Sequence, residues 1–403
     1  MNQNRIPLML IFLVVFIDLL GFGIVFPVLP SFSMNVLKLN ELQIGLVISI
    51  FSFFQFLFNP ILGRISDTVG RRKILLFSLL LTAVGYIMFS FSRSFEMLLF
   101  SRIISGIGSS SIGVAQAYIA DVTTPSERSK GMGVIGMAFG LGFTFGPMMG
   151  GFLASFGHEY SGYVSAGFSV LAFLFCLFLL PESLPKEILR ANIGKRVKIQ
   201  FLDIAILKRI LVSPKLAFSV LSFLLVTGVS SILFGTFAIL ALEKYHMSDQ
   251  EVGIIYTVIG LSTAVSQGVL LPIFIKRVSD KTTLLVGIGT IVIGLIGFPI
   301  AGSMEMIILF SVVYSLGSGL LVPVYVSIIS KITPPEEQGS VLGVNQSLAA
   351  IGRMFGPLYG GSTYQYLGSL FPFFSGAVFA LAIFVVTLLK FDNIITNRED
   401  VSV

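Results

Sequence analysis

Three ionisable residues stand inside long apolar runs, where a charge is expensive. Asp18 follows LMLIFLVVFI, Arg102 follows MLLFS, and Arg353 lies in LAAIGRMFG. Charged side chains inside membrane segments are rare and mark ion or substrate pathways. These three residues are therefore the first candidates for proton coupling and transport.

Each of these charges has a functional and a structural interpretation. Asp18 can accept a transported proton if burial disfavours its charged form. Alternatively it partners polar groups near a helix break, because Pro27 and Pro30 follow it. Arg102 could attract an anionic substrate or act on a neighbouring carboxylate. Its structural alternative is an ion pair or a ligand for backbone carbonyls.

Uncharged polar residues in the same runs are candidates for lining a substrate cavity. Taken singly, each is more often a packing or interhelical hydrogen-bonding residue than a ligand contact. His158 and His246 fall in expected outer loops and are weak candidates for a proton relay. The candidate cavity residues are Gln55, Gln116, Tyr118, Gln267, Asn345 and Gln346.

Motifs of other chemistries do not occur in the sequence. We find no phosphate-binding loop, no metal-ligand cluster and no nucleophile elbow, so ATP-driven transport, a cofactor, a bound metal and enzymatic catalysis are not expected. The single cysteine, Cys176, lies in an apolar run and is expected to be buried and inert.

Two glycine-containing stretches carry a mechanical rather than a chemical signal. In the first, the glycines predict a tight turn between two helices, and Asp67 is expected near the start of the second helix, where the dipole favours a negative charge. In the second, proline bends a helix whose glycines permit close packing. The stretches comprise Gly63, Asp67, Gly70, Arg71, Arg72 and Lys73, and then Gly142, Gly146, Pro147, Gly150 and Gly151.

The second stretch occurs twice in the chain. FGPMMGG at 145–151 returns as FGPLYGG at 355–361, and Thr124-Pro125 returns as Thr333-Pro334. A shared offset of about 210 residues predicts two related halves, an arrangement found in secondary transporters. The weaker pair Ser66-Asp67 and Ser279-Asp280 fits the same repeat.

The elements that position these residues are membrane-spanning helices. The 403 residues are 55% hydrophobic and only 11% charged, whereas soluble domains carry roughly 25% charged residues. About 20 apolar residues span a bilayer. Twelve such runs are predicted at 6–29, 42–63, 74–92, 96–120, 130–154, 161–181, 214–241, 250–275, 282–302, 305–330, 339–361 and 370–390.

The domain organisation and orientation follow from the gaps between these runs. We expect an all-α membrane protein with a six-helix bundle at 1–181, a basic cytoplasmic linker at 182–213 and a second bundle at 214–403. With the N-terminus in the cytoplasm, 21 of the 26 lysines and arginines fall on the cytoplasmic side. The positive-inside rule then places both termini inside the cell membrane. The net charge of +6 needs no nucleic acid to explain it.

Together these motifs resemble the major facilitator superfamily, in its branch of twelve-helix drug:proton antiporters. Residues 63–73 are similar to the loop between helices 2 and 3, and 18–30 to the helix 1 motif. Arg102 with Gly106 is similar to the helix 4 motif linked to proton coupling, and 142–151 to the antiporter motif of helix 5. The resemblance implies alternating access about a central cavity, with Asp67 helping to lock the cytoplasmic side.

Tetracycline exporters look most similar, yet this chain departs from them at polar positions. Gly85 and Ile291 stand near the places where they carry acidic residues, and Ser262 or Thr263 near a membrane histidine. Tetracycline is therefore not the expected substrate.

The predicted function is secondary active transport, as proton-coupled efflux of a hydrophobic or amphipathic small molecule. The alternative is a facilitator or importer of a metabolite or lipid-like substrate, because the fold does not fix the substrate. A receptor or enzyme is disfavoured. The expected partners are a small molecule, protons and the lipid bilayer, without nucleic acid, and the chain is expected to function as a monomer.

Overall fold

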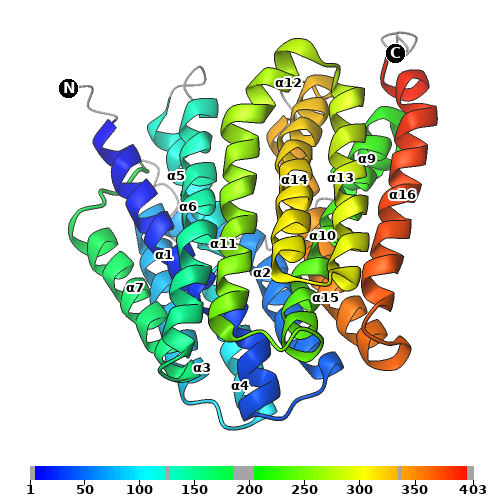
Figure 1. Cartoon of the computed structure of the whole chain (residues 1–403). Coiled ribbons are helices and arrows are strands. Elements are labelled where there is room, and N and C mark those ends of the chain that lie inside the picture. The colour runs from blue at the N-terminus through cyan, green and yellow to red at the C-terminus, as the bar shows by residue number, and fades with distance from the viewer. Residues whose placement is uncertain (1–4, 124–127, 185–203, 335–337, 397–403) are drawn as a thin grey trace. The chain divides into compact units, whose positions relative to one another are not determined.

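The computed structural model describes residues 5–123, 128–184, 204–334 and 338–396, and the regular structure within them is helical (Figure 1). The first helices are α1 (Arg5–Ser31), a π-helical turn (Phe32–Val36), α2 (Glu41–Val69), α3 (Arg71–Ser90), α4 (Phe95–Gly108), α5 (Ser111–Val122), α6 (Arg128–Ala154) and α7 (His158–Phe178).

The remaining helices follow the basic segment. They are α9 (Ile204–Val212), α10 (Pro214–Glu243), α11 (Asp249–Val265), a π-helical turn (Ser266–Leu270), α12 (Leu271–Arg277), α13 (Asp280–Ile300), α14 (Met304–Ile332), α15 (Gln338–Leu367), α16 (Phe371–Phe391) and a final π-helical turn (Asp392–Thr396).

The chain divides into two compact units. The first comprises residues 1–201 together with 241–257, and the second comprises 202–240 together with 258–403. The end of α10 and the first turns of α11 thus belong with the first unit. The sequence-based boundaries at 181/182 and 213/214 stay a prediction.

Within the described residues, eleven spans are long and apolar enough to cross a membrane. The α4–α5 pair forms one of these spans, and α11 with the following turn and α12 forms another. The twelfth expected span is α15, which has 30 residues but carries Asn345, Gln346 and Arg353. Its polarity, rather than its length, sets α15 apart from the other eleven.

In the first unit, α1 is the central helix. It packs against α6 and α7, while α3 packs against α4 and α7, and α2 against α4. The core at one end combines apolar side chains of α1, α3, α5 and α7, including Ile11, Leu75, Val114 and Cys176. The expectation of a buried Cys176 is confirmed.

In the second unit, α13 packs against both α14 and α16. The short helix α9 lies within the expected linker and contributes Ile210 to a core with Val220, Ile329 and Val341. The segment after the first six spans therefore does not serve only as a tether, because its last part anchors on the second unit.

Two expected helices differ in the structure. The second run continues as helix to Val69, six residues beyond its expected end. The fourth run is interrupted after Gly108, where the Gln55 side chain of α2 donates to the Ser109 carbonyl at 3.2 Å. Ser110 donates in return to the Gln55 carbonyl at 3.3 Å. These bonds satisfy backbone groups that a helix break leaves open.

Candidate functional site

Asp18 lies midway along α1 and is buried in the first unit, with 7% of its surface exposed. Ser111, at the start of α5, lies within hydrogen-bonding distance of its carboxylate. The carboxylate oxygen Oδ1 has no hydrogen-bond partner among the described residues. A buried carboxylate with one free oxygen is well placed to accept a proton, because its charged form lacks full solvation.

Arg102, on α4, is buried to 3% exposure in the same unit. Its guanidinium carbon lies 5.9 Å from the ring centre of Tyr86 and 5.5 Å from that of Phe89, within the range of cation–π attraction. Its Nε and Nη2 atoms and the Tyr86 hydroxyl lack partners within the described chain. No ion pair joins Arg102 to Asp18 in these residues, although both interact electrostatically with Tyr86.

The structure brings Asp18 and Arg102 into one bundle and places Arg353 in the other. Arg353 lies at the middle of α15 in the second unit and is partly exposed. Of the candidate cavity residues, Gln116, Gln267 and Gln346 are exposed within membrane-spanning helices. Exposed amides at such positions are expected to face a water-filled cavity.

Of the three other cavity candidates, two have structural roles in this conformation and the third is buried. Gln55 bridges α2 to the α4–α5 break. Tyr118 is fully buried, and its hydroxyl donates to the Pro181 carbonyl at 3.0 Å. Asn345 is also fully buried, and neither side-chain polar atom has a partner among the described residues.

The junction between α2 and α3 is tighter than the sequence suggested. Gly63 lies inside α2, so the expectation that it belongs to the turn is wrong. Gly70 alone makes the turn, with φ of 112°, a backbone conformation that favours glycine. Asp67 lies in the last turn of α2 rather than at the start of α3, so its expected interaction with the α3 dipole is also wrong.

Arg71 is the hub of this junction. Its side chain is 9% exposed and pairs with Asp67 at 2.5 Å and with Asp121 of α5 at 3.1 Å. It also donates to Ser66 at 2.7 Å. The planar guanidinium spreads five donors over three nitrogens, so it reaches acceptors that lie too far apart for a compact ammonium to serve together. Arg71 thereby ties the end of α2 and the start of α3 to the end of α5.

Glu182, which sequence analysis did not single out, replaces Asp67 at the start of α3. Its carboxylate accepts from the backbone N–H of Arg71 at 2.9 Å and of Arg72 at 3.2 Å. The first N–H groups of a helix have no partner within it, and a carboxylate there is favoured by the dipole. The only signal in the sequence is an acid directly after Pro181 at the end of an apolar run.

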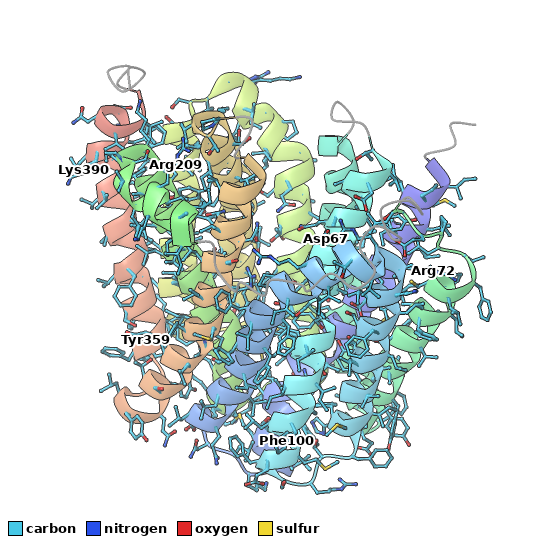
Figure 2. All side chains as sticks on the ribbon, turned by 180° about the vertical axis from the view of Figure 1, so that it is seen from behind. Asp67, Arg72, Phe100, Arg209, Tyr359 and Lys390 are labelled. Atoms are coloured by element: carbon cyan, nitrogen blue, oxygen red, sulfur yellow. The ribbon has the colours of Figure 1, made fainter. Side chains whose placement is uncertain are left out.

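Arg72 makes the complementary contact at the end of α7. Its Nε donates to the Cys176 carbonyl at 3.2 Å, and its Nη2 donates to the Leu177 carbonyl. A cation at the carboxyl end of a helix is favoured by the dipole. Arg72 and Glu182 together lock α3 to α7 at the end where Figure 2 shows Asp67 and Arg72, while Phe100 lies at the other end of this unit.

The glycines of α6 form a flat face against α1. A Cβ on Gly142 would meet Leu19, one on Gly146 would lie 2.6 Å from Gly23, and one on Gly150 would collide with the Ile24 carbonyl. The helices therefore approach so closely that a methyl group does not fit. The packing of Gly352, Gly356 and Gly360 of α15 against Gly228, Ser231 and Ile232 of α10 repeats this arrangement.

Gly151 and Pro147 lie against the first turns of α11. A Cβ on Gly151 would lie 2.5 Å from the Asp249 carbonyl, and one on Gly253 would lie 2.5 Å from the Pro147 carbonyl. Asp249 also pairs with His158 at 3.0 Å, and His158 Nε2 is 3.0 Å from the Ser31 hydroxyl. His158 begins α7, so its expected place in an outer loop is wrong.

Comparison with known proteins identifies the family. The model of the Major Facilitator Superfamily matches residues 11–303 and 219–401. This chain belongs to the major facilitator superfamily. It is a multi-pass membrane transporter rather than an enzyme, and the predicted all-α fold is confirmed.

Individual relatives show which members of the superfamily this chain resembles. Multidrug resistance protein 2 of Bacillus subtilis is 27% identical over 393 residues, covering 96% of each chain. The class H tetracycline resistance protein of Pasteurella multocida is 27% identical and covers 91% of this chain and 90% of its own. The crystal structure of the human organic anion transporter MFSD10 (TETRAN) matches with a TM-score of 0.72, 27% identity, and coverage of 96% and 100%. The predicted similarity to drug-efflux proteins is confirmed.

Proposed function

We propose that this transporter exports an amphipathic small molecule in exchange for protons, by alternating access, with Asp18 as the proton-binding group. The observation that carries the proposal is the Asp18 carboxylate, buried midway along α1 with one unpartnered oxygen. Intramembrane carboxylates of this kind act as proton relays in transporters. The similarity to a multidrug and a tetracycline resistance protein supports efflux as the direction.

Arg102 is the second member of the proposed coupling site. Its guanidinium remains charged, so protonation of Asp18 changes the net charge buried in the first unit. A change in buried charge gives the two conformations different stabilities, which is what couples proton binding to a structural transition. Arg353 is proposed to act in the second unit, at the substrate.

The remaining proposed roles concern the scaffold. The α2–α3 junction, built on Gly70, Asp67, Arg71 and Arg72, gates one end of the first unit. The glycines at 142, 146, 150 and 151 with Pro147 let α6 slide against its neighbours during the transition. The protein is proposed to act as a monomer in the cytoplasmic membrane, with both termini inside and without nucleic acid as a partner.

The experiment is proton-driven transport in proteoliposomes containing purified protein. A panel of fluorescent amphipathic dyes is tested with and without an imposed pH difference. We expect Asp18→Asn to reduce gradient-driven accumulation at least tenfold while exchange of dye between the two sides continues. Asp392→Asn, which removes an exposed carboxylate paired with Lys281, is the matched control and is expected to transport normally.

Two results would contradict the proposal. One is full gradient-driven accumulation by Asp18→Asn. The other is dye uptake that runs down its own gradient in the wild-type protein and never moves protons, which would favour the facilitator instead.

A further inference from the structure

A polar stripe runs along α15 in the second unit. Gln346 is exposed and Arg353 is partly exposed, and the two are seven residues apart. Seven residues are nearly two helical turns, so both side chains lie on the same side of the helix, separated by about 10 Å along its axis. Gly352 and Gly356 pack against α10, so the stripe flanks the packed face.

Arg353 cannot bring its charge to the membrane surface. It lies 15 residues after Gln338 and 14 before Leu367, which places it about 20 Å from either end of α15. Arginine side chains near helix ends extend to the interface, but none can cover that distance. Its guanidinium therefore stays at membrane depth.

No carboxylate among the described residues of the second unit neutralises this charge. Asp280 begins α13, Glu305 is the second residue of α14, and Asp392 follows α16, so the acids of its described residues lie at helix ends. Asp280 and Asp392 pair with Lys331 and Lys281. Within the described parts of the chain the Arg353 side chain forms no ion pair or hydrogen bond.

An unpaired cation at this depth is costly unless water or a ligand solvates it. Arg102 differs, because the rings of Tyr86 and Phe89 lie within cation–π range of its guanidinium. The Arg353 side chain is instead partly exposed, and the Gln346 side chain offers an amide donor two helical turns away. Both features suit a ligand that brings its own negative charge.

We propose that the substrate is an amphipathic organic anion, whose carboxylate or sulfonate binds Arg353 while a polar group some 10 Å away binds Gln346. This inference rests on the proposed function and specifies that the exported substrate is negatively charged. The guanidinium can hold such an anion through two parallel hydrogen bonds. An apolar body fits the surrounding helices.

The membrane potential acts in the same direction. Moving a negative charge out of a cell that is negative inside is favourable. Exchange for an entering proton moves net charge the same way, so both components of the proton gradient drive export of an anion. A cationic substrate would work against the potential.

The experiment measures binding without a gradient. Three aromatic acids, built on naphthyl, biphenyl and pyrenyl bodies, are each compared with the uncharged amide of the same body. Purified detergent-solubilised protein is titrated, and binding is followed by ligand fluorescence anisotropy. Because the chain has no tryptophan, protein emission overlaps little with the probes.

We expect the wild-type protein to bind at least one acid tenfold more tightly than its amide. Arg353→Gln should remove this preference by weakening acid binding tenfold or more and amide binding less than twofold, and Arg353→Lys should restore part of it. Arg277→Gln, which removes an exposed arginine of the same unit, is the matched control. Thermal unfolding of each variant reports whether it is folded.

If the wild-type protein binds none of the acids more tightly than its amide, the proposal is wrong. It is equally wrong if folded Arg353→Gln or Arg353→Lys keeps the full preference. Failure of proton coupling is a separate result, because the binding experiment uses no gradient. Even if neither the wild-type protein nor Asp18→Asn showed gradient-driven transport, selective binding of the acid through Arg353 would persist.

Discussion

Arg71 shows how one side chain can hold three helices together at the end of a bundle. It contacts Asp67 and Ser66 of α2 and Asp121 of α5, and its own backbone N–H is held by Glu182. Asp121 also accepts from Ser183 at 2.8 Å. A conformational change that separates these helices must break several of these contacts together. The junction therefore switches rather than deforming gradually.

Replacing Arg71 by lysine should disconnect this network. Lysine keeps the charge but has no planar fork, so it can serve Asp67 or Asp121 but not Ser66 as well. We expect a loss of stability of about 1–3 kcal/mol from unsatisfied partners, and transport reduced severalfold. Thermal unfolding in detergent and dye transport measure the two effects.

Lys73→Ala provides the comparison, because Lys73 is exposed two residues away and its loss removes a charge without opening the network. Similar defects in both variants would show that the positive charge of the segment matters rather than the contacts of Arg71.

At the residue scale, the sequence located the charges inside the helices but not the groups that contact them. The types and spacing of Asp18, Arg102 and Arg353 were sufficient to select them, because charges in apolar runs are conspicuous. The capping acid of α3 was assigned to Asp67, but it is Glu182, more than 100 residues later. Local spacing cannot reveal that partner, since it depends on how α3 and α7 pack.

At the scale of helices, the close approach of α6 to α1 is the feature most sensitive to single atoms. Their contact is backbone against backbone at Gly142, Gly146 and Gly150. Along this row of glycines the two helices have little interlocking surface, which suits sliding between two states, and Phe143 of α6 packs on Phe22 and Phe26 of α1 beside it. The matching contact of α15 on α10 gives each unit the same kind of interface.

Gly150→Ala should test this interface directly. The added methyl would overlap the Ile24 carbonyl, which belongs to the backbone and cannot move aside. Overpacking of this kind costs about 1–3 kcal/mol, and we expect a lower unfolding temperature and slower transport.

Gly140→Ala is its control on the same helix, since a Cβ there has no atom within 4 Å. Alanine favours helix over glycine by about 1 kcal/mol, so this variant should be as stable as wild type or more so. Equal behaviour of the two variants would mean that α6 and α1 have room to separate.

The helices themselves were predictable from apolar runs, and their breaks were not. The interruption between α4 and α5 follows from Gly108 and from Ser109 and Ser110, which bond with Gln55 of another helix. The extension of α2 to Val69 runs through polar residues that hydropathy assigned to a loop. Its end is set by Gly70 and by the contacts of Arg71, both of which depend on tertiary structure.

At the scale of the whole molecule, the two halves share architecture but not charge. The offset of 210 residues pairs Asp121 with Lys331, and Lys331 binds Asp280 at 2.9 Å, whereas Asp121 binds Arg71. The acid at this position in the first unit is thus a base in the second, and its partner changes from Arg71 to Asp280. Gating is therefore expected to be asymmetric, with the buried arginine hub in the first unit and an exposed pair in the second.

Basic residues gather at corresponding ends of the units, which predicts the orientation of the chain. Figure 2 shows Arg209 and Lys390 at one end of the second unit, with Tyr359 nearer the other, and Asp67 and Arg72 mark the basic end of the first. The positive-inside rule assigns these ends to the cytoplasm. The single native thiol, Cys176, is buried and leaves little background for cysteine labelling.

Single cysteines at the ends of two helices can decide the orientation. In a Cys176→Ser background, Arg93→Cys and Gly302→Cys should react with a membrane-impermeant maleimide in intact cells. Lys73→Cys and Lys276→Cys should react only after permeabilisation. All four positions are exposed, and α3, which separates Lys73 from Arg93, spans about 30 Å with its 20 residues. The reverse labelling pattern would place both termini outside, and it would turn the proposed export by the same proton gradient into uptake.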